Sequence, residues 1–226
     1  MKHGKKYLES LKKYDASAHN DVVSAADLVK KLAFAKFDET VDVSIKLNLK
    51  KSQSVRDTVV LPHQFRGEKK VLVFCKSEKE KEALDAGATY VGSDDLIEKI
   101  KGGWLDFDVA VATPDMMKDV GKLGMVLGRK GLMPNPKTGT VTFDLKSAIA
   151  ELKKGRVEFR ADKTGVIHLP IGKVSMEPAK IAENVQVVIA EIRRKKPADA
   201  KGDFIQSVSI SSTMGPGVWV ALKDKE

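Results

Sequence analysis

The run VLVFC at residues 71–75 is apolar at every position. A strand of this kind is buried on both faces of its sheet, which is typical of parallel strands covered by helices on both sides. Two further short strands follow, TYVG at 89–92 and FDVAVAT at 107–113, and helical segments separate them. We therefore expect residues 67–155 to form a Rossmann-like three-layer α/β domain.

The segments before and after this region alternate apolar and polar residues instead, as half-buried antiparallel strands do. The clearest is ETVDVSIKLNLK at 39–50, which places apolar side chains on one face and polar side chains on the other. The same pattern predicts a second strand antiparallel to it and two later hairpins, at residues 55–62, 156–172 and 203–222.

Because the two outer segments share one pattern, we expect them to build one domain together. The predicted fold class is α/β in the mixed α+β sense. A discontinuous α+β domain has an antiparallel sheet built from residues 1–66 and 156–226, and the Rossmann-like domain is inserted in it. The two connections, at Gly67 and near Gly155, would then act together as a hinge.

Two amphipathic helices are predicted in the outer segments. Residues 24–35 place Ser24 as an N-cap, with Asp27 at the capping-box position. Residues 177–196 carry apolar side chains at helical spacing, and Pro197 stops the helix.

Charge is distributed unevenly along the chain. The net charge is +9, of which residues 1–70 carry +6 and residues 156–226 carry +3, while residues 71–155 sum to zero. Within that neutral stretch, residues 71–120 carry −5 and residues 121–155 carry +5. Such separation favours oriented binding to a polyanion, and a merely solvated charged surface is an equal alternative.

The motifs give no support for nucleotide or metal chemistry. GRKGLMPNPKTG at 128–139 is glycine-rich and basic, but no segment has the Walker spacing of a phosphate-binding loop. VLVFCKSEKE lacks the glycines of a dinucleotide site. The four histidines are too widely spaced for metal ligands. TPD at 113–115 indicates the start of a helix, which we expect to run from Pro114 to near Gly128. We expect no enzyme activity, no cofactor and no metal.

The chain is expected to be cytoplasmic. It has no run of about 18 apolar residues for a membrane span, and its first residues, MKHGKKYLES, turn polar at once. The single Cys75 excludes an internal disulfide, fits a reducing compartment and is expected to be a buried structural thiol.

A row of hydroxyls is one feature that fits nucleic acid. One face of the strand from Phe204 carries short hydroxyl side chains ahead of the glycine turn MGPG, at Ser207, Ser209, Ser211 and Thr213. Such groups exchange hydrogen bonds with phosphate and ribose oxygens. The alternative is a plain solvent face.

The segment FAKFDET is the second feature. Lys36 and Phe37 follow a predicted helix end, where a lysine can pair with phosphate and a phenyl ring can pack on a base or ribose. The alternative is that Phe37 is a core residue.

The glycine-rich stretch 128–139 is expected to display charge. Its two prolines keep it from joining a helix and its glycines permit turns. It would act as a semi-rigid arm that presents three basic residues, Arg129, Lys130 and Lys137. We expect this arm to be either an auxiliary nucleic-acid contact or a domain-interface element.

Several strings occur together and in order over nearly the whole chain. They are HGKKY, LAFAKFDETV, VLPH, AGATYVG, DFDVAVATPDMM, LGRKGLMPNPKTGTV, FRADKTGVIHLPIGK and SSTMGPG. In these strings the chain resembles the L-one family of bacterial ribosomal proteins, which form the mobile stalk of the large subunit.

The resemblance implies a structural ribosomal protein whose discontinuous domain binds 23S rRNA at the mobile stalk. It implies no catalysis. It further implies a part in releasing deacylated tRNA from the exit site, a monomer when off the ribosome, and compatibility with repression of the chain's own operon mRNA. The rRNA-binding positions that it implies are Lys36, Phe37, Thr40, Arg160, Lys173, Ser207, Thr213, Met214 and Gly215.

Overall fold

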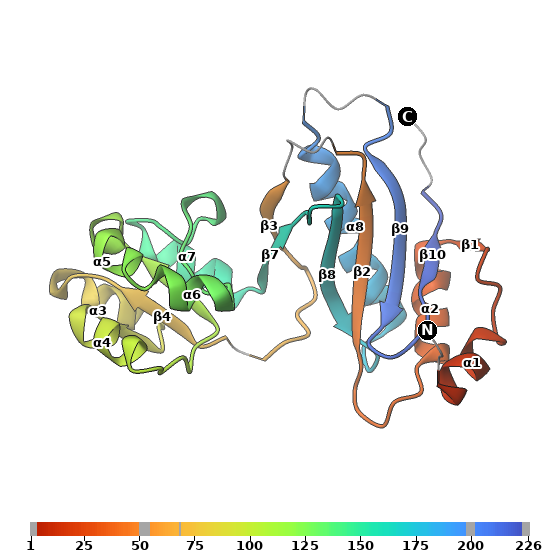
Figure 1. Cartoon of the computed structure of the whole chain (residues 1–226), viewed down its shortest axis with the longest axis horizontal. Coiled ribbons are helices and arrows are strands. Elements are labelled where there is room, and N and C mark those ends of the chain that lie inside the picture. The colour runs from red at the N-terminus through yellow and green to blue at the C-terminus, as the bar shows by residue number, and fades with distance from the viewer. Residues whose placement is uncertain (1–3, 50–54, 68, 198–201, 223–226) are drawn as a thin grey trace. The chain divides into compact units, whose positions relative to one another are not determined.

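The computed structural model describes residues 4–49, 55–67, 69–197 and 202–222. The chain divides into two compact units (Figure 1). The first takes both ends of the chain, up to Phe65 and from Glu158, and the second runs from Arg66 to Val157. Both units combine helices with sheet, which confirms the predicted mixed fold class.

The first unit is centred on a five-stranded sheet with the order β1-β10-β9-β2-β8. Its strands are β1 (His19–Asn20), β2 (Thr40–Leu47), β8 (Val166–Lys173), β9 (Ile205–Ser212) and β10 (Val218–Val220). Strand β2 is antiparallel to both of its neighbours, β8 and β9, whereas β1 pairs in parallel with β10. The antiparallel pairing of β9 with β10 confirms the hairpin predicted for residues 203–222.

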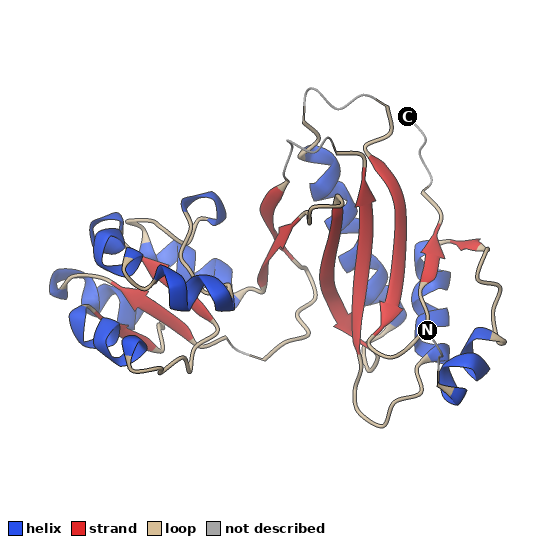
Figure 2. Ribbon diagram, in the orientation of Figure 1, coloured by secondary structure: helices blue, strands red, loops and turns tan. Residues whose placement is uncertain are grey.

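The two faces of this sheet differ in chemistry because β2 and β9 alternate apolar and polar residues. The apolar residues of β2 are buried, at Val41, Val43, Ile45 and Leu47. Helices α2 (Val22–Leu32) and α8 (Pro178–Arg194) pack on this apolar face and on each other (Figure 2). Among the described residues, Figure 2 shows no helix over the other face of the central strands.

Two of the predicted strand pairings were wrong. Strands β3 (Arg56–Val60) and β7 (Arg156–Arg160) form a two-stranded sheet of their own. Because β8 and β9 occupy both edges of β2, no edge is left for β3. The turn from Asp162 to Gly165 is present, but it leads from β7 in one sheet to β8 in the other instead of closing a hairpin.

The helices of the first unit start slightly differently from the prediction. Helix α2 begins at Val22 with Asp21 as its N-cap, so Ser24 lies inside the first turn. The Asp21 carbonyl accepts the first helical hydrogen bond, from the N–H of Ala25 at 2.8 Å. Helix α8 ends at Arg194, before Pro197, as predicted. A short helix, α1 (Lys5–Leu11), precedes α2 in the chain.

The second unit contains a three-stranded parallel sheet with the order β5-β4-β6. The strands are β4 (Val71–Phe74), β5 (Tyr90–Gly92) and β6 (Val109–Ala112). Helices α4 (Asp94–Lys101), α5 (Met117–Gly121) and α6 (Gly124–Lys130) supply one apolar layer, and α3 (Ser77–Asp85) and α7 (Leu145–Lys153) supply the other.

These two layers explain why VLVFC is apolar throughout. Leu72 and Phe74 point into one cluster, while Val71, Val73 and Cys75 point into the other. All five side chains are fully buried. Burial raises the pKa of the Cys75 thiol, in keeping with the predicted structural role.

The segment after β6 contains three short elements instead of the single helix predicted from Pro114 to near Gly128. They are the 3-10 helix η1 (Pro114–Met116), α5 and α6. Thr113 is the N-cap residue of η1, which confirms the helix start at TPD. Helix α6 continues until Gly131, whose φ of 70° ends it. Arg129 and Lys130 therefore lie in the last helical turn and not in a loop, which corrects the prediction.

Candidate nucleic-acid interface

Two loops meet at one end of the five-stranded sheet. The first joins α2 to β2 and contains Lys36 and Phe37, and the second joins β9 to β10 and contains Met214 and Gly215. They are adjacent because the start of β2 pairs with the end of β9. Two predicted features that are far apart in the sequence thus become neighbours.

The buried side chain of Glu39 connects these two loops. Its Oε1 accepts hydrogen bonds from the N–H groups of Phe34 at 3.2 Å and Ala35 at 2.9 Å, and its Oε2 accepts one from Met214 at 3.0 Å. Burial raises the pKa of Glu39, but these hydrogen bonds, with one from the Ser212 hydroxyl, outweigh burial and leave the pKa below its ordinary value. The carboxylate is therefore charged at neutral pH.

Thr213 makes a second connection between the loops. Its hydroxyl accepts a hydrogen bond from the N–H of Thr40 at 3.0 Å and donates one to the Thr40 carbonyl at 3.2 Å. Thr40 is the first residue of β2, so this pair fixes the point at which both loops leave the sheet.

The tips of the two loops expose apolar and basic side chains. Phe37 is 57% exposed and Met214 is 51% exposed, and Lys36 is exposed between helix and strand. Phe37 is therefore not a core residue, which removes that alternative. An exposed aromatic ring and a thioether beside a lysine offer stacking surface for a base next to a cation for phosphate.

Gly215 leaves room for the hydroxyl of Ser212 in its loop. A Cβ atom at this position would lie 2.5 Å from the hydroxyl oxygen of Ser212. That hydroxyl accepts a hydrogen bond from the N–H of Gly215 at 3.2 Å and donates one to Glu39. A side chain at 215 would displace the hydroxyl that links the second loop to the buried carboxylate.

Lys173, at the end of β8, lies at the same end of the sheet. It pairs with Thr40 in the strand register, and its Nζ is 3.6 Å from Oδ2 of Asp38. Desolvation raises the pKa of Asp38, but hydrogen bonds from the hydroxyl and N–H of Ser175, together with Lys173, lower it below its ordinary value. A polyanion would compete with Asp38 for this lysine.

The face of the sheet opposite the helices carries a continuous polar surface from this end. Ser209 and Ser211 on β9 are partly exposed, as predicted, and their partners on β2 are Ser44 and Asp42. Ser44 shares a hydrogen bond of 2.9 Å with Nδ1 of His168 on β8. Small hydroxyls and an imidazole thus extend the surface beyond the loops.

Two of the predicted site residues lie away from the loops. Ser207 pairs with Lys46 near the other end of β9, about 20 Å along the strand from Thr213. Arg160 is exposed at the end of β7, outside the five-stranded sheet. The structure therefore gathers seven of the nine positions at one end of the sheet, which are Lys36, Phe37, Thr40, Lys173, Thr213, Met214 and Gly215.

The auxiliary basic residues belong to the second unit. Arg129 and Lys130 are exposed on α6, beside Met125, which is 77% exposed. Lys137 lies in the 3-10 helix η2 (Pro136–Thr138). Hydrogen bonds close the turn around η2. The Asn135 carbonyl accepts one from the hydroxyl of Thr138 at 3.0 Å and one from the hydroxyl of Thr140 at 3.1 Å.

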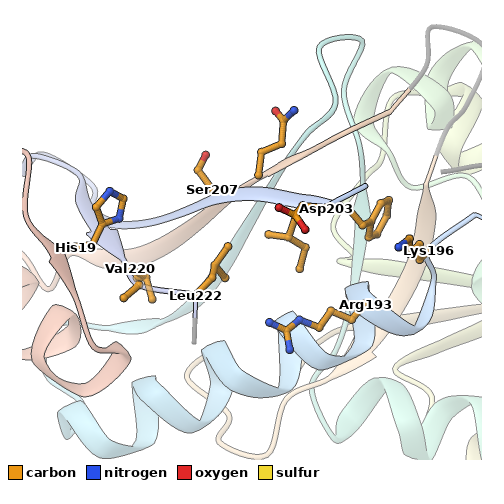
Figure 3. A pocket seen from close by; sticks show the side chains of 11 residues that line it. His19, Arg193, Lys196, Asp203, Ser207, Val220 and Leu222 are labelled. Atoms are coloured by element: carbon orange, nitrogen blue, oxygen red, sulfur yellow. The ribbon is translucent and has the colours of Figure 1, made fainter. Parts of the chain in front are cut away.

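A separate pocket of about 520 Å³ lies at the opposite end of β9, between β10 and the end of α8 (Figure 3). Its lining combines apolar side chains, such as Phe204 and Leu222, with charged ones, and Figure 3 shows Arg193 and Lys196 projecting from the α8 side. Ser207 is the one predicted site residue in its lining. The pocket is therefore distinct from the two loops.

The described residues contain no group of three or more His, Cys, Asp or Glu side chains that could hold a metal ion. Across the same part of the chain, no helix is long and apolar enough to cross a membrane.

Comparison with known proteins identifies the family. Residues 29–216 match the family described as Ribosomal protein L1p/L10e. The chain belongs to this family. Its members are structural proteins of the ribosome and not enzymes, as the sequence motifs predicted.

Among the relatives is the large ribosomal subunit protein uL1 of Treponema denticola, which is 73% identical over 223 residues that cover 99% of both chains. The uL1 protein of Treponema pallidum is 60% identical over 226 residues and 100% of both chains. The uL1 protein of Borrelia hermsii is 59% identical over 217 residues, or 96% of this chain and 97% of its own.

Glu39 was not among the predicted site residues, although the residue pattern of its segment points to it. In ETVDVSIKLNLK it is the residue that starts the alternation, two positions before the first buried valine, and it shares the buried phase. A carboxylate in the buried phase of a strand signals a specific set of hydrogen-bond donors. His168 was not among the predicted site residues, because nothing in the sequence places it opposite Ser44.

Proposed function

We propose that the chain is a cytoplasmic, structural constituent of the large ribosomal subunit that binds 23S rRNA at the mobile stalk. In this role it assists release of deacylated tRNA from the exit site and is a monomer when off the ribosome. The family and the full-length relatives support the ribosomal part of the proposal. The rRNA contact is proposed from the geometry of the first unit.

The pair of joined loops is the observation that carries this proposal. Two apolar side chains, Phe37 and Met214, are about half exposed on loops whose backbones are fixed by Glu39 and Thr213. Exposing such side chains costs free energy in water, and fixing them in place favours a defined ligand surface over a flexible one. Lys36 and Lys173 supply positive charge beside them.

We further propose that the unit formed by both ends of the chain is the rRNA-binding domain. The sheet face with Ser207 would extend the contact along the RNA, and Arg160 would add a peripheral phosphate contact. Arg129, Lys130 and Lys137 of the second unit would contribute an auxiliary contact to rRNA or to exit-site tRNA. The proposed role of Lys137 follows from its charge alone. Those of the other residues also follow from their exposure, since Arg129, Lys130 and Arg160 are exposed and Ser207 is partly exposed.

Repression of the chain's own operon mRNA would use the same loops. A surface that recognises a folded RNA by shape binds any RNA with that shape. Competition between an mRNA leader and the rRNA fragment for the purified chain tests this, because separate sites would allow both to bind at once.

The proposed function is tested by binding a 23S rRNA fragment that contains the stalk base, and an unrelated folded RNA of equal length, across a salt series. Phosphate contacts alone predict a similar steep loss for both, with each contact adding roughly −0.7 to −0.9 to the log–log slope. We expect the stalk fragment to remain bound at salt concentrations that release the control. Equal loss of both RNAs would mean that the chain binds polyanions in general and does not recognise the stalk fragment.

Lys36→Gln sharpens this test. Loss of one phosphate contact should lower the salt slope for the stalk fragment by about 0.7 to 0.9. Arg194→Gln is the matched control, because Arg194 is an exposed cation at the far end of α8 that pairs with Glu191. That variant should leave the slope unchanged.

A further inference from the structure

We propose that Glu39 is a positioning residue for RNA recognition, which holds the two RNA-facing loops in their binding arrangement before RNA arrives. This inference rests on the proposed function. Glu39 is 1% exposed and does not reach the surface, so it acts through the backbones that it binds.

The hydrogen bonds of the Glu39 carboxylate join the two loops. Phe34 and Ala35 lie directly before Lys36 and Phe37, and Met214 is itself at the tip of the second loop. The Ser212 hydroxyl, which also holds Gly215, completes the set. One carboxylate therefore accepts four donors from segments that are separated by some 175 residues in the sequence.

The site requires a carboxylate and not merely a polar side chain of that shape. Both oxygens face N–H donors, with two on Oε1 and one on Oε2. A glutamine would have to turn its NH₂ group toward one loop, where it would meet another donor. Glu39→Gln should therefore release one loop while it preserves the volume of the side chain.

Charge alone predicts the opposite effect on binding. Removing a negative charge near the site makes the protein more positive, and that should tighten its association with a polyanion. Loss of positioning should weaken binding, because RNA would then have to order a loop that is already ordered in the native protein. The sign of the change in affinity separates the two effects.

The experiment compares Glu39→Gln with the native chain in binding the stalk fragment, at a temperature where both are folded by circular dichroism. We expect about a tenfold loss of affinity at an unchanged salt slope, because the phosphate contacts remain. We also expect faster amide exchange in free Glu39→Gln, at Met214 or at Phe34 and Ala35.

Asn184→Ser is the matched control. Asn184 is fully buried on α8 and hydrogen-bonds the backbone of His63 and Ile171, so its loss destabilises the same unit without touching either loop. This variant should keep its affinity for the stalk fragment.

The possible outcomes separate this proposal from the proposed function. If the native chain does not prefer the stalk fragment, the proposed function fails. If it does and Glu39→Gln binds equally or more tightly, only the positioning role is wrong. If Asn184→Ser loses as much affinity as Glu39→Gln, the effect is one of general stability and the positioning role is again wrong.

Discussion

Thr213 and Thr40 are joined by two hydrogen bonds between one hydroxyl and one peptide backbone, at 3.0 Å and 3.2 Å. The hydroxyl is both acceptor and donor, so no purely apolar side chain of the same shape can replace it. The pair ties the exit of β9 to the entry of β2.

Thr213→Val should therefore loosen the loop junction. Two hydrogen bonds are lost at an exposed position where water can substitute, so we expect the free energy of unfolding to fall by only about 1 kcal/mol. Affinity for the stalk fragment should fall more, by about tenfold. Denaturant unfolding and RNA titration measure the two effects. Thr213→Ser keeps the hydroxyl, and a loss of affinity as large as that of the valine variant would contradict this account.

Gly215→Ala should weaken RNA binding through Ser212. The new Cβ would lie 2.5 Å from the Ser212 hydroxyl oxygen, which must rotate away and give up its hydrogen bonds. Gly217 is the control in the same loop, because a Cβ there meets nothing within 4 Å. We expect several-fold weaker RNA binding for Gly215→Ala and native affinity for Gly217→Ala. Equal behaviour of the two variants would argue against the packing explanation.

Stability should depend on pH through Glu39. Its pKa in the folded chain is lowered from an ordinary value of 4.5, so folding is stabilised at pH values above 4.5. This contribution is lost as the pH falls from 4.5 through the lower folded pKa, because protons then bind the unfolded chain first. Measured by denaturant unfolding from pH 6 downward, the native chain should lose stability more steeply than Glu39→Gln. Parallel pH profiles would assign the acid sensitivity to other carboxylates.

The basic residues of the second unit should matter less than the loops. We expect the triple variant Arg129→Gln, Lys130→Gln and Lys137→Gln to weaken stalk binding less than the double variant Thr213→Ala with Met214→Ala. The triple variant should mainly lower the salt slope, since it removes charges alone. A larger loss of affinity from the triple variant would reverse this ranking.

Periodicity predicted the fold where a segment has one burial pattern. Strand β2 alternates because it buries one face, and β4 is apolar throughout because it buries both. Both strands were predicted correctly. The pairing of strands was harder to predict, because the residue patterns of β3 and β7 are compatible with several neighbouring strands. Their pairing depends on which edges of β2 are already taken, and that is a property of the whole sheet.

The sequence predicts individual residues of the candidate site but not their arrangement in space. Lys36, Phe37 and the hydroxyl row were visible as local features, and the resemblance to a family added Thr40 and Met214. Nothing local placed Glu39 against Met214, because that contact depends on the β2–β9 register. The sequence offers both Gly128 and Gly131 as helix ends, and only the structure shows that the left-handed residue is Gly131, which places Arg129 inside the helix.

The bond between Glu39 and Met214 spans 175 residues of sequence, with the whole second unit between its partners. During synthesis the segment that forms the first loop is made early. The second loop, which supplies its hydrogen-bond partners, is made only with the last strands. On our proposal, an incomplete nascent chain, or a fragment ended by premature termination, therefore has no finished RNA-binding surface. If that surface binds rRNA as proposed, truncated products would compete poorly with the intact protein for the same rRNA.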